Sequence, residues 1–119
     1  RRIEARTIAR IARGRGAVAA LGGGAILRPR NVRVLRGSGT VVYLSVPLAT
    51  LFARGERSAR GARPLWSAAT RKGRLTRIRT LLAARLPLYR SSAHVAVSAA
   101  RGTPAEISAR IQRLLARRP

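Results

Sequence analysis

The segment from Val41 to Val46, Val-Val-Tyr-Leu-Ser-Val, restricts the fold more than any other part of the chain. It is β-branched and apolar on both faces, whereas a strand with one face in water alternates apolar and polar residues. Parallel strands that are covered by helices on both sides have this pattern. The segment therefore predicts a parallel sheet buried between helices.

Helical and strand patterns alternate along the rest of the chain. We predict two further strands, over Ala17 to Leu21 and around His94 to Val97, and five helices, over residues 3–12, 31–36, 47–52, 75–86 and 104–115. The last helix opens with a capping box, Thr103-Pro104-Ala105-Glu106. This alternation indicates βαβ units and a single α/β layered domain over residues 1–119.

Glycine and proline mark the predicted boundaries. Gly14 and Gly16 should end the first helix, and Pro87 should end the fourth. From about residue 55 to 70 the helical pattern fails among scattered Gly, Pro, Arg and Ser. A loop of this length is typical of a functional segment, and we interpret it as a lid.

The charge is very unequal: 26 Lys and Arg residues stand against three Glu residues, which gives a formal net charge of +23. Such a chain should bind nucleic acid non-specifically through counterion release. The basic residues are spread along the whole chain, and only 3% of residues are aromatic, so no stacking surface for single strands is expected. With 46% hydrophobic residues, a packed core is still expected.

The residues that are missing exclude several kinds of site. Without Cys there can be no disulfide, thiolate metal site or cysteine nucleophile, and with one His and no Asp a metal cage is not expected. No apolar run approaches the roughly 20 residues that cross a bilayer. We expect a soluble cytoplasmic protein that does not bind membranes.

The beginning of the chain suggests an origin in something longer. It contains no Met and opens on Arg1 and Arg2, inside the pattern of the first helix. We therefore expect it to be the C-terminal part of a longer protein.

Three consecutive glycines, Gly22 to Gly24, follow the predicted strand that ends at Leu21. Ligands of open α/β sheets bind at the carboxyl ends of strands, where backbone N–H groups without side chains can contact a carboxylate or phosphate. A plain tight turn is the other interpretation. The triplet alone does not distinguish a ligand-binding turn from a plain turn, so other motifs of the chain are needed.

Several short motifs occur in a characteristic order. Arg1-Arg2-Ile3-Glu4 opens the chain, GGGA and VVYL follow, and Arg63-Pro64-Leu65 and Arg85-Leu86-Pro87-Leu88-Tyr89 come later. In order and spacing they resemble shikimate kinase over the length of the chain. The resemblance implies a P-loop, nucleoside-monophosphate-kinase-like α/β fold with a parallel sheet flanked by helices. It also implies transfer of the γ-phosphoryl of ATP to the 3-hydroxyl of shikimate, in the pathway to chorismate and the aromatic amino acids.

The resemblance assigns substrate-binding roles residue by residue. Arg1 and Arg85 match the arginines that grip the shikimate carboxylate, and Arg suits this role because its planar fork binds a carboxylate through two bonds. Gly22, Gly23 and Gly24 match the glycines whose backbone lies against the substrate. Glu4 matches the acid that supports these contacts.

The resemblance also assigns two residues to the nucleotide side. Arg63 matches the catalytic lid arginine, which closes over the phosphates and stabilises the charge that develops during transfer. Arg101, in the loop before the last helix, should approach the adenine. Trp66, Tyr89 and His94 are expected to be packing or structural groups.

The chain departs from the family in its nucleotide-binding parts. It contains no G-x-x-x-x-G-K-[ST] loop, its one Lys is Lys72, and it has no Asp to match the family's substrate-side base. In the family these parts precede the Arg-x-x-Glu motif. ATP and Mg²⁺ should therefore be bound mainly by residues outside this chain, with no metal ligand within it.

The missing parts also bear on stability and activity. In the family the phosphate-loop strand lies between the GGG strand and the VVYL strand. We expect the isolated chain to be inactive and either marginal in stability or misfolded, and the complete protein to be a monomer. Two alternatives remain: a basic nucleic-acid-binding protein, and a degenerate kinase-like domain that only binds a small carboxylate. A saturable effect of shikimate would separate the enzyme origin from nucleic-acid binding.

Overall fold

The computed structural model describes residues 2–57 and 70–117. Along the chain the elements are α1 (Arg2–Arg13), the 3₁₀ helix η1 (Ala25–Leu27), α2 (Pro29–Ser38), β1 (Val42–Ser45), α3 (Leu48–Arg57), α4 (Arg71–Ser92), β2 (Val95–Ser98) and α5 (Pro104–Ala116). The chain divides into two compact units, residues 1–43 with 87–96 and residues 44–86 with 97–119. Both β1 and β2 contribute residues to each unit.

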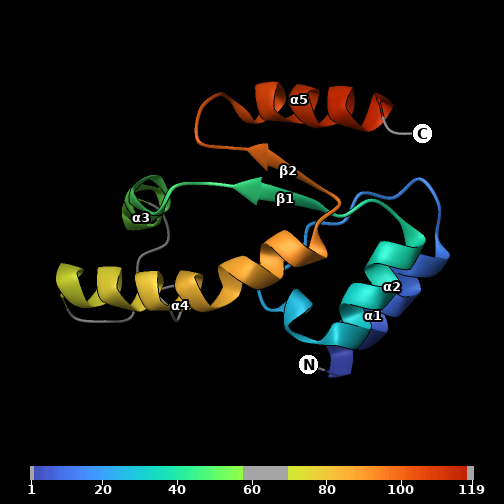
Figure 1. Cartoon of the computed structure of the whole chain (residues 1–119), viewed down its shortest axis with the longest axis horizontal. Coiled ribbons are helices and arrows are strands. Elements are labelled where there is room, and N and C mark those ends of the chain that lie inside the picture. Colours follow the sequence, from blue (N-terminus) through green and yellow to red (C-terminus); the bar gives the residue numbers. More distant parts are fainter. Residues whose placement is uncertain (1, 58–69, 118–119) are drawn as a thin grey trace. The chain divides into compact units, whose positions relative to one another are not determined.

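The described sheet consists of β1 and β2. The carbonyl of Val41 accepts hydrogen bonds from the backbone N–H groups of His94 and Val95, and four residues further on the carbonyl of Ser45 accepts from Ala99. Because both strands advance together, they are parallel (Figure 1). Leu44 is 49% exposed, so the expectation that both faces of this strand are covered is wrong at that position.

The predicted strand over Ala17–Leu21 is wrong. These residues form no ladder, all of them are exposed, and Val18 is completely exposed at 101%. An apolar segment becomes a strand only when a neighbouring backbone pairs with its N–H and C=O groups. Among the described residues, the sheet offers pairing to β1 and β2 alone.

In the first unit, α1 and α2 lie side by side (Figure 1). Ile8 of α1 is buried at 3% exposure, and four arginines of the same helix are exposed: Arg2, Arg6, Arg10 and Arg13. Spacings of three and four residues put these arginines on one side of the helix. The helix ends as predicted, with the Gly14 N–H bonded to the carbonyl of Ile11 and with Gly16 at a φ of 71°.

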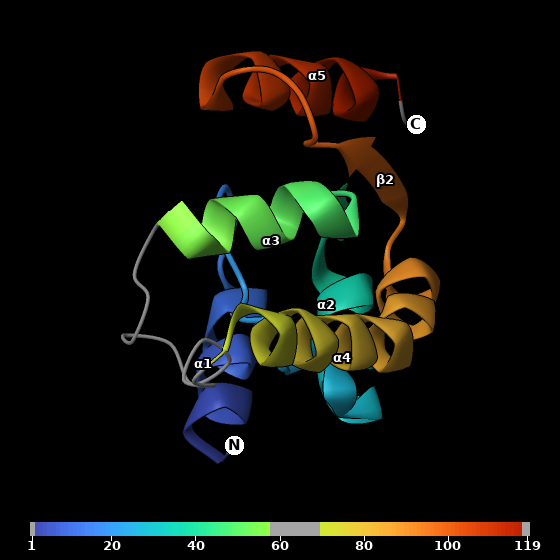
Figure 2. The same cartoon turned by 90° about the vertical axis from the view of Figure 1, so that its left-hand side faces the viewer.

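In the second unit, α3 packs on the first turns of α4 (Figure 2). Phe52 and Ile78, each 4% exposed, form the centre of this cluster. Half-buried leucines surround them: Leu48, Leu51, Leu75 and Leu82. The predicted inward face of α3 is confirmed. The guanidinium of Arg71 lies 5.1 Å from the centre of the Phe52 ring, within the range of a cation–π contact.

Helix α3 is longer than predicted. It continues through Gly55, which is buried, to Arg57, so the stretch expected to be a loop from residue 55 begins as helix. Glu56 forms an ion pair with Arg74 of α4, and this pair fixes the last turn of α3 on the neighbouring helix. The rest of the predicted lid, residues 58–69, lies outside the described residues.

Helix α4 does not end at Pro87 but continues to Ser92, so this predicted boundary is also wrong. A proline inside a helix removes one backbone hydrogen bond and costs about 3 kcal/mol. Contacts beyond it hold the helix in the first unit: Tyr89 packs on Tyr43, and Arg36 donates a hydrogen bond to the carbonyl of Ser92. Tertiary contacts here outweigh a local signal.

Helix α5 begins with the predicted capping box. The Thr103 hydroxyl accepts from the Glu106 N–H, and the Glu106 carboxylate accepts from the Thr103 N–H. Of the predicted apolar face, Ile107, Ile111 and Leu114 are half-buried and Leu115 is 37% exposed. None of the helices in the described part of the chain is long and apolar enough to span a membrane.

Candidate functional site

The glycine triplet forms a turn between the extended segment and η1. Gly22 and Gly23 are exposed, and Gly24 is half-buried. The Gly22 carbonyl accepts from the N–H of Ala25 at 3.1 Å, and the Gly24 carbonyl accepts from Leu27 at 3.2 Å. The triplet thus leads directly into a hydrogen-bonded 3₁₀ turn.

At Gly22 the turn itself does not demand glycine. Positive φ values among the described glycines occur at Gly16 and Gly102, not within the triplet. A Cβ atom added to Gly22 would meet nothing within 4 Å. Backbone strain therefore does not explain three glycines here, and open space above Gly22 leaves its backbone accessible to a ligand.

The buried side-chain amide of Asn31 stabilises the residues that follow the turn. Asn31, at the start of α2, is 3% exposed and donates from Nδ2 to the carbonyl of Ala25 at 2.9 Å. Ala25, directly after the triplet, is 1% exposed. Sequence reasoning missed Asn31, although a lone Asn at the start of a basic helix is the kind of residue that binds local backbone.

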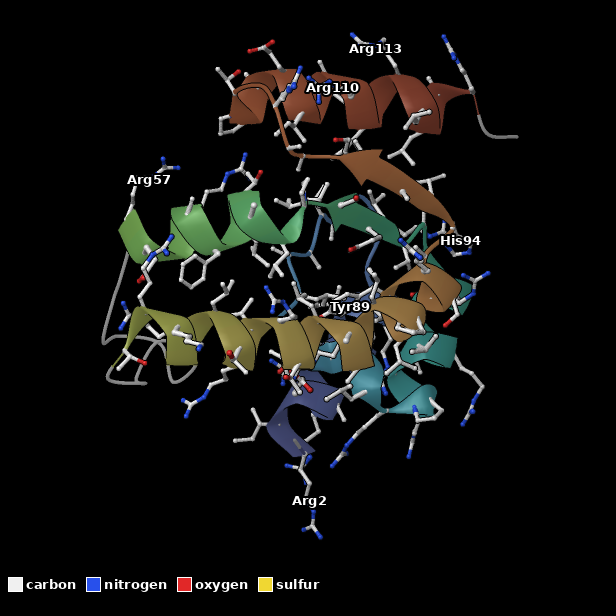
Figure 3. The ribbon with its side chains drawn as sticks, turned by 60° about the vertical axis from the view of Figure 1, so that its left-hand side comes forward. Arg2, Arg57, Tyr89, His94, Arg110 and Arg113 are labelled. Carbon is white, nitrogen blue, oxygen red and sulfur yellow. The ribbon has the colours of Figure 1, made fainter. Side chains whose placement is uncertain are left out.

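Tyr89 joins two of the motifs that resemble the family. Its hydroxyl donates to the carbonyl of Gly23 at 3.1 Å, so the PLY end of α4 meets the GGG turn (Figure 3). Its ring lies 5.5 Å from the ring of Tyr43 in β1, tilted by 30°. Tyr89 is a packing residue, as predicted, because its ring contacts Tyr43. Its hydroxyl also binds the backbone of the glycine turn.

His94, labelled in Figure 3, has a structural contact, as expected. Its Nδ1 accepts a hydrogen bond from the N–H of Val41 at 2.9 Å. The contact uses the lone pair of Nδ1 as the acceptor. The ring joins the beginning of β2 to the residue before β1.

The other predicted substrate residues have the following places. Glu4 is half-buried in the first turn of α1, in the first unit. Arg85 is half-buried in α4, in the second unit. Arg1 and Arg63 lie outside the described residues, as does Trp66. The roles of all these residues toward shikimate and ATP stay predictions.

The loop after β2 is held by arginines that sequence reasoning did not single out. Arg54 of α3 donates from one nitrogen to the carbonyls of Ala99 and Ala100, at 3.0 and 3.1 Å. Arg110 of α5 donates to the carbonyl of Ser98 at 3.1 Å. Arg101 itself is exposed in this loop, next to Gly102 with its φ of 107°.

Within the described part of the chain, no three His, Cys, Asp or Glu side chains gather into a group that could hold a metal ion. Magnesium prefers carboxylate oxygens, and two of the three glutamates are committed elsewhere. Glu56 binds the Arg74 guanidinium through both of its oxygens, and Glu106 belongs to the capping box. The described residues do not fit a magnesium site.

A shallow hollow of about 780 Å³ follows α4 from Thr70 to Ala84. Its described lining includes Lys72, Gly73 and Thr76, and none of the predicted site residues that the structure describes belongs to it. The described wall belongs to one end and one side of a single helix. It does not enclose a small molecule.

Comparison with known proteins gives one consistent result. The family model for shikimate kinase matches residues 1–116. The shikimate kinase of Symbiobacterium thermophilum is 40% identical over 118 residues, which are 99% of this chain and 66% of that protein. The shikimate kinase of Aromatoleum aromaticum is 36% identical over 115 residues, which are 97% of this chain and 63% of that protein.

Solved structures agree with the sequences. Shikimate kinase from Acinetobacter baumannii in complex with shikimate matches with a TM-score of 0.84 and 30% identity, over 95% of this chain and 60% of that one. Shikimate kinase from Bacteroides thetaiotaomicron matches with a TM-score of 0.80 and 26% identity, over 97% and 65%. These matches confirm the expected kinase-like α/β fold.

The chain spans 55% to 66% of the length of the first three curated relatives that it matches. The motifs from which the resemblance was inferred lie along its whole length, and the family model extends over nearly all of it. The chain belongs to the shikimate kinase family.

Proposed function

We propose that this chain binds shikimate as the substrate-binding part of an ATP-dependent shikimate kinase. The observation that carries the proposal is the glycine triplet, which has no positive φ and leaves open space above Gly22. A solved relative that matches 95% of the chain is in complex with shikimate. The reaction is transfer of the γ-phosphoryl of ATP to the 3-hydroxyl of shikimate.

Each group has a role that its chemistry suits. Arg1 and Arg85 bind the carboxylate of shikimate, because a guanidinium fork can form two parallel bonds to it. The backbone of Gly22, Gly23 and Gly24 lies against the substrate ring. Glu4, an acceptor in its ionised form, orients donors around the substrate.

The nucleotide side depends on residues at the lid and after β2. Arg63 of the lid stabilises the negative charge that develops on the transferring phosphoryl, and Arg101 approaches the adenine. ATP and Mg²⁺ are bound mainly by residues other than these 119, which contain no Walker A sequence. The 119 residues alone bind shikimate but do not transfer phosphate. We further propose that the complete enzyme is a cytoplasmic monomer.

The test replaces Arg85 with Lys and measures shikimate affinity by calorimetry. Arg85→Lys keeps the charge but loses the fork, so we expect about tenfold weaker binding, which corresponds to ~1.4 kcal/mol. Arg79→Lys, an exposed position of the same helix, is the matched control and should bind like the parent chain. Equal affinities of the two variants would exclude a carboxylate grip by Arg85.

Nucleic-acid binding is a second candidate function, favoured by one observation. Four exposed arginines share one side of α1, and the chain carries a formal net charge of +23. We expect salt-sensitive binding of duplex DNA without sequence preference. A fluorescence anisotropy titration with two unrelated duplexes measures it. Binding of one duplex much more tightly than the other would show a specific role instead.

A domain that binds a small carboxylate without transfer is the remaining alternative. It shares the shikimate-binding residues and differs only in the phosphoryl step. A longer protein that contains this sequence together with a phosphate loop would decide between them. Formation of shikimate 3-phosphate from ATP would support the kinase, and saturable shikimate binding without product would support the carboxylate-binding domain.

A further inference from the structure

The hydrogen bond from Tyr89 to Gly23 stands out because it joins two segments that are far apart in the sequence. The hydroxyl of Tyr89 lies 3.1 Å from the Gly23 carbonyl oxygen, 66 residues away along the chain. Both residues belong to the first unit. Figure 3 shows Tyr89 on the last turns of α4.

The Gly23 carbonyl takes part in a contact with another element, in addition to the local hydrogen bonds of the turn. Gly22 and Gly24 each accept from an N–H three residues further on, at Ala25 and Leu27. The Gly23 carbonyl accepts from a side chain of another element. Tyr89 therefore fixes the peptide group between Gly23 and Gly24.

Fixing this carbonyl fixes a whole peptide plane. A trans peptide is planar, so the C=O of Gly23 and the N–H of Gly24 point in opposite directions. With the carbonyl directed at Tyr89, the Gly24 N–H is directed away from it. Glycines on both sides make rotation of such a plane easy, because glycine has the widest choice of backbone angles.

The Tyr89 ring is itself held in place. It packs against Tyr43 of β1 with a centroid distance of 5.5 Å, and both side chains are half-buried. Aromatic pairs at this distance attract each other beyond the area that they bury. The hydroxyl therefore reaches Gly23 from a fixed ring.

We propose that Tyr89 is a positioning residue, which holds the Gly23–Gly24 peptide in the orientation that shikimate meets. Tyr89 does not contact the substrate. The inference rests on the proposed function, in which the triplet lies against shikimate, and adds the residue that organises it.

The test compares Tyr89→Phe with the parent chain. Phe keeps the ring and its packing but removes the hydroxyl, so we expect shikimate to bind about five- to tenfold more weakly, the usual effect of one net hydrogen bond. The Gly24 amide signal should shift in NMR spectra. The thermal midpoint should stay nearly the same, because the bond is at the surface.

Tyr43→Phe is the matched control, since it removes the same group from the partner ring. It should leave both the affinity and the Gly24 amide signal as they are. A role in packing alone predicts a different pattern: Tyr89→Phe would behave like the parent chain, and only Tyr89→Leu would lose affinity, together with thermal stability. That pattern would overturn the proposal.

The experiment also separates this inference from the proposed function. If the parent chain shows no saturable shikimate binding, the proposed function fails, and with it the substrate named here. The Gly24 amide signal of Tyr89→Phe, measured without substrate, still reports the orientation of the Gly23–Gly24 peptide. An unchanged signal overturns the positioning role, and a shifted signal supports it for a ligand other than shikimate.

Discussion

At the scale of single residues, Gly22 is the glycine of the triplet that the fold alone does not explain. Gly22 has no positive φ, and an added Cβ would contact nothing within 4 Å. The fold would accept alanine at this position, and the backbone there is open to solvent. A glycine in such a place indicates that a ligand approaches the backbone.

This separation of fold from function can be tested by Gly22→Ala. The substitution should leave the thermal midpoint unchanged or raise it slightly, because alanine restricts the unfolded chain and stabilises by about 0.4–1 kcal/mol. Shikimate should bind at least about tenfold more weakly, because the new methyl group occupies the surface that the substrate needs. Calorimetry and thermal unfolding measure the two effects.

The control is Gly37→Ala in α2, where an added Cβ also meets nothing within 4 Å. It should stabilise in the same way without any change of affinity. If Gly22→Ala binds shikimate like Gly37→Ala, the backbone of Gly22 does not lie against the substrate.

The structural roles of individual arginines could not be predicted from the sequence. The fork of Arg85 was predicted from a motif, whereas the structural roles of Arg54 and Arg110 were not predicted at all. In a chain with 26 basic residues, position and spacing do not reveal which guanidinium meets a backbone carbonyl. That choice depends on where α3 and α5 pass the loop after β2.

At the scale of elements, the sequence predicts a helix end correctly where the hydrogen bonds of that end lie within a few residues of one another. The capping box at Thr103 and the glycine end of α1 were both predicted and both formed, because each bond lies within a few residues. The strand over Ala17–Leu21 was wrong because a strand depends on a partner elsewhere. Helix α4 continued past Pro87 because distant contacts hold its last turn.

The capping box makes α5 sensitive to acid. The hydrogen bond from the Thr103 N–H lowers the pKa of Glu106 below the ordinary value of a glutamate, with a smaller contribution from Arg110. A carboxylate with a lowered pKa stabilises the folded form above its ordinary pKa and loses that contribution as the pH falls below it. Circular dichroism should therefore show α5 losing helicity below about pH 4.5.

Thr103→Ala should lose about 1 kcal/mol of helix stability at neutral pH and make the acid transition of α5 smaller. Ser108→Ala removes a hydroxyl from an exposed position of the same helix, and alanine favours helix, so this control should not lose stability. Equal helicity of both variants at every pH would show that the box does not stabilise α5.

The ion pair between α3 and α4 is the second prediction at this scale. Arg74 is buried, and its guanidinium nitrogens lie 2.8 and 3.1 Å from the two Glu56 oxygens. Removing one partner leaves the other charge poorly solvated, so Glu56→Gln should destabilise by about 3 kcal/mol. Urea unfolding measures this. A loss below about 0.5 kcal/mol, as at an exposed pair, would contradict the buried role.

At the scale of the whole molecule, charge opposes folding. The formal net charge of +23 is spread over both units, and the large side chains that are exposed include Ile3 at 79% and Val18 at 101%. No large side chain among the described residues falls below 2% exposure, so each unit has a small core. Self-repulsion should therefore be a large part of the balance.

We expect sodium chloride to stabilise the chain. Raising the salt from about 0.1 M to 1 M shortens the screening length from about 10 Å to 3 Å and weakens repulsion between arginines. The thermal midpoint should rise with salt, and at low salt the transition should be broad. A sharp transition whose midpoint falls with salt would mean that attractive ion pairs dominate instead.

The central claim is that these residues form a shikimate-binding surface at the glycine turn. The most direct measurement is an NMR titration of the isotopically labelled chain with shikimate, and a parallel titration with acetate. We expect saturable shifts of the Gly22, Gly23 and Gly24 amides and of the Arg85 side chain with shikimate, and weak unsaturated shifts with acetate. The same small shifts with both compounds, spread over the exposed arginines, would contradict it.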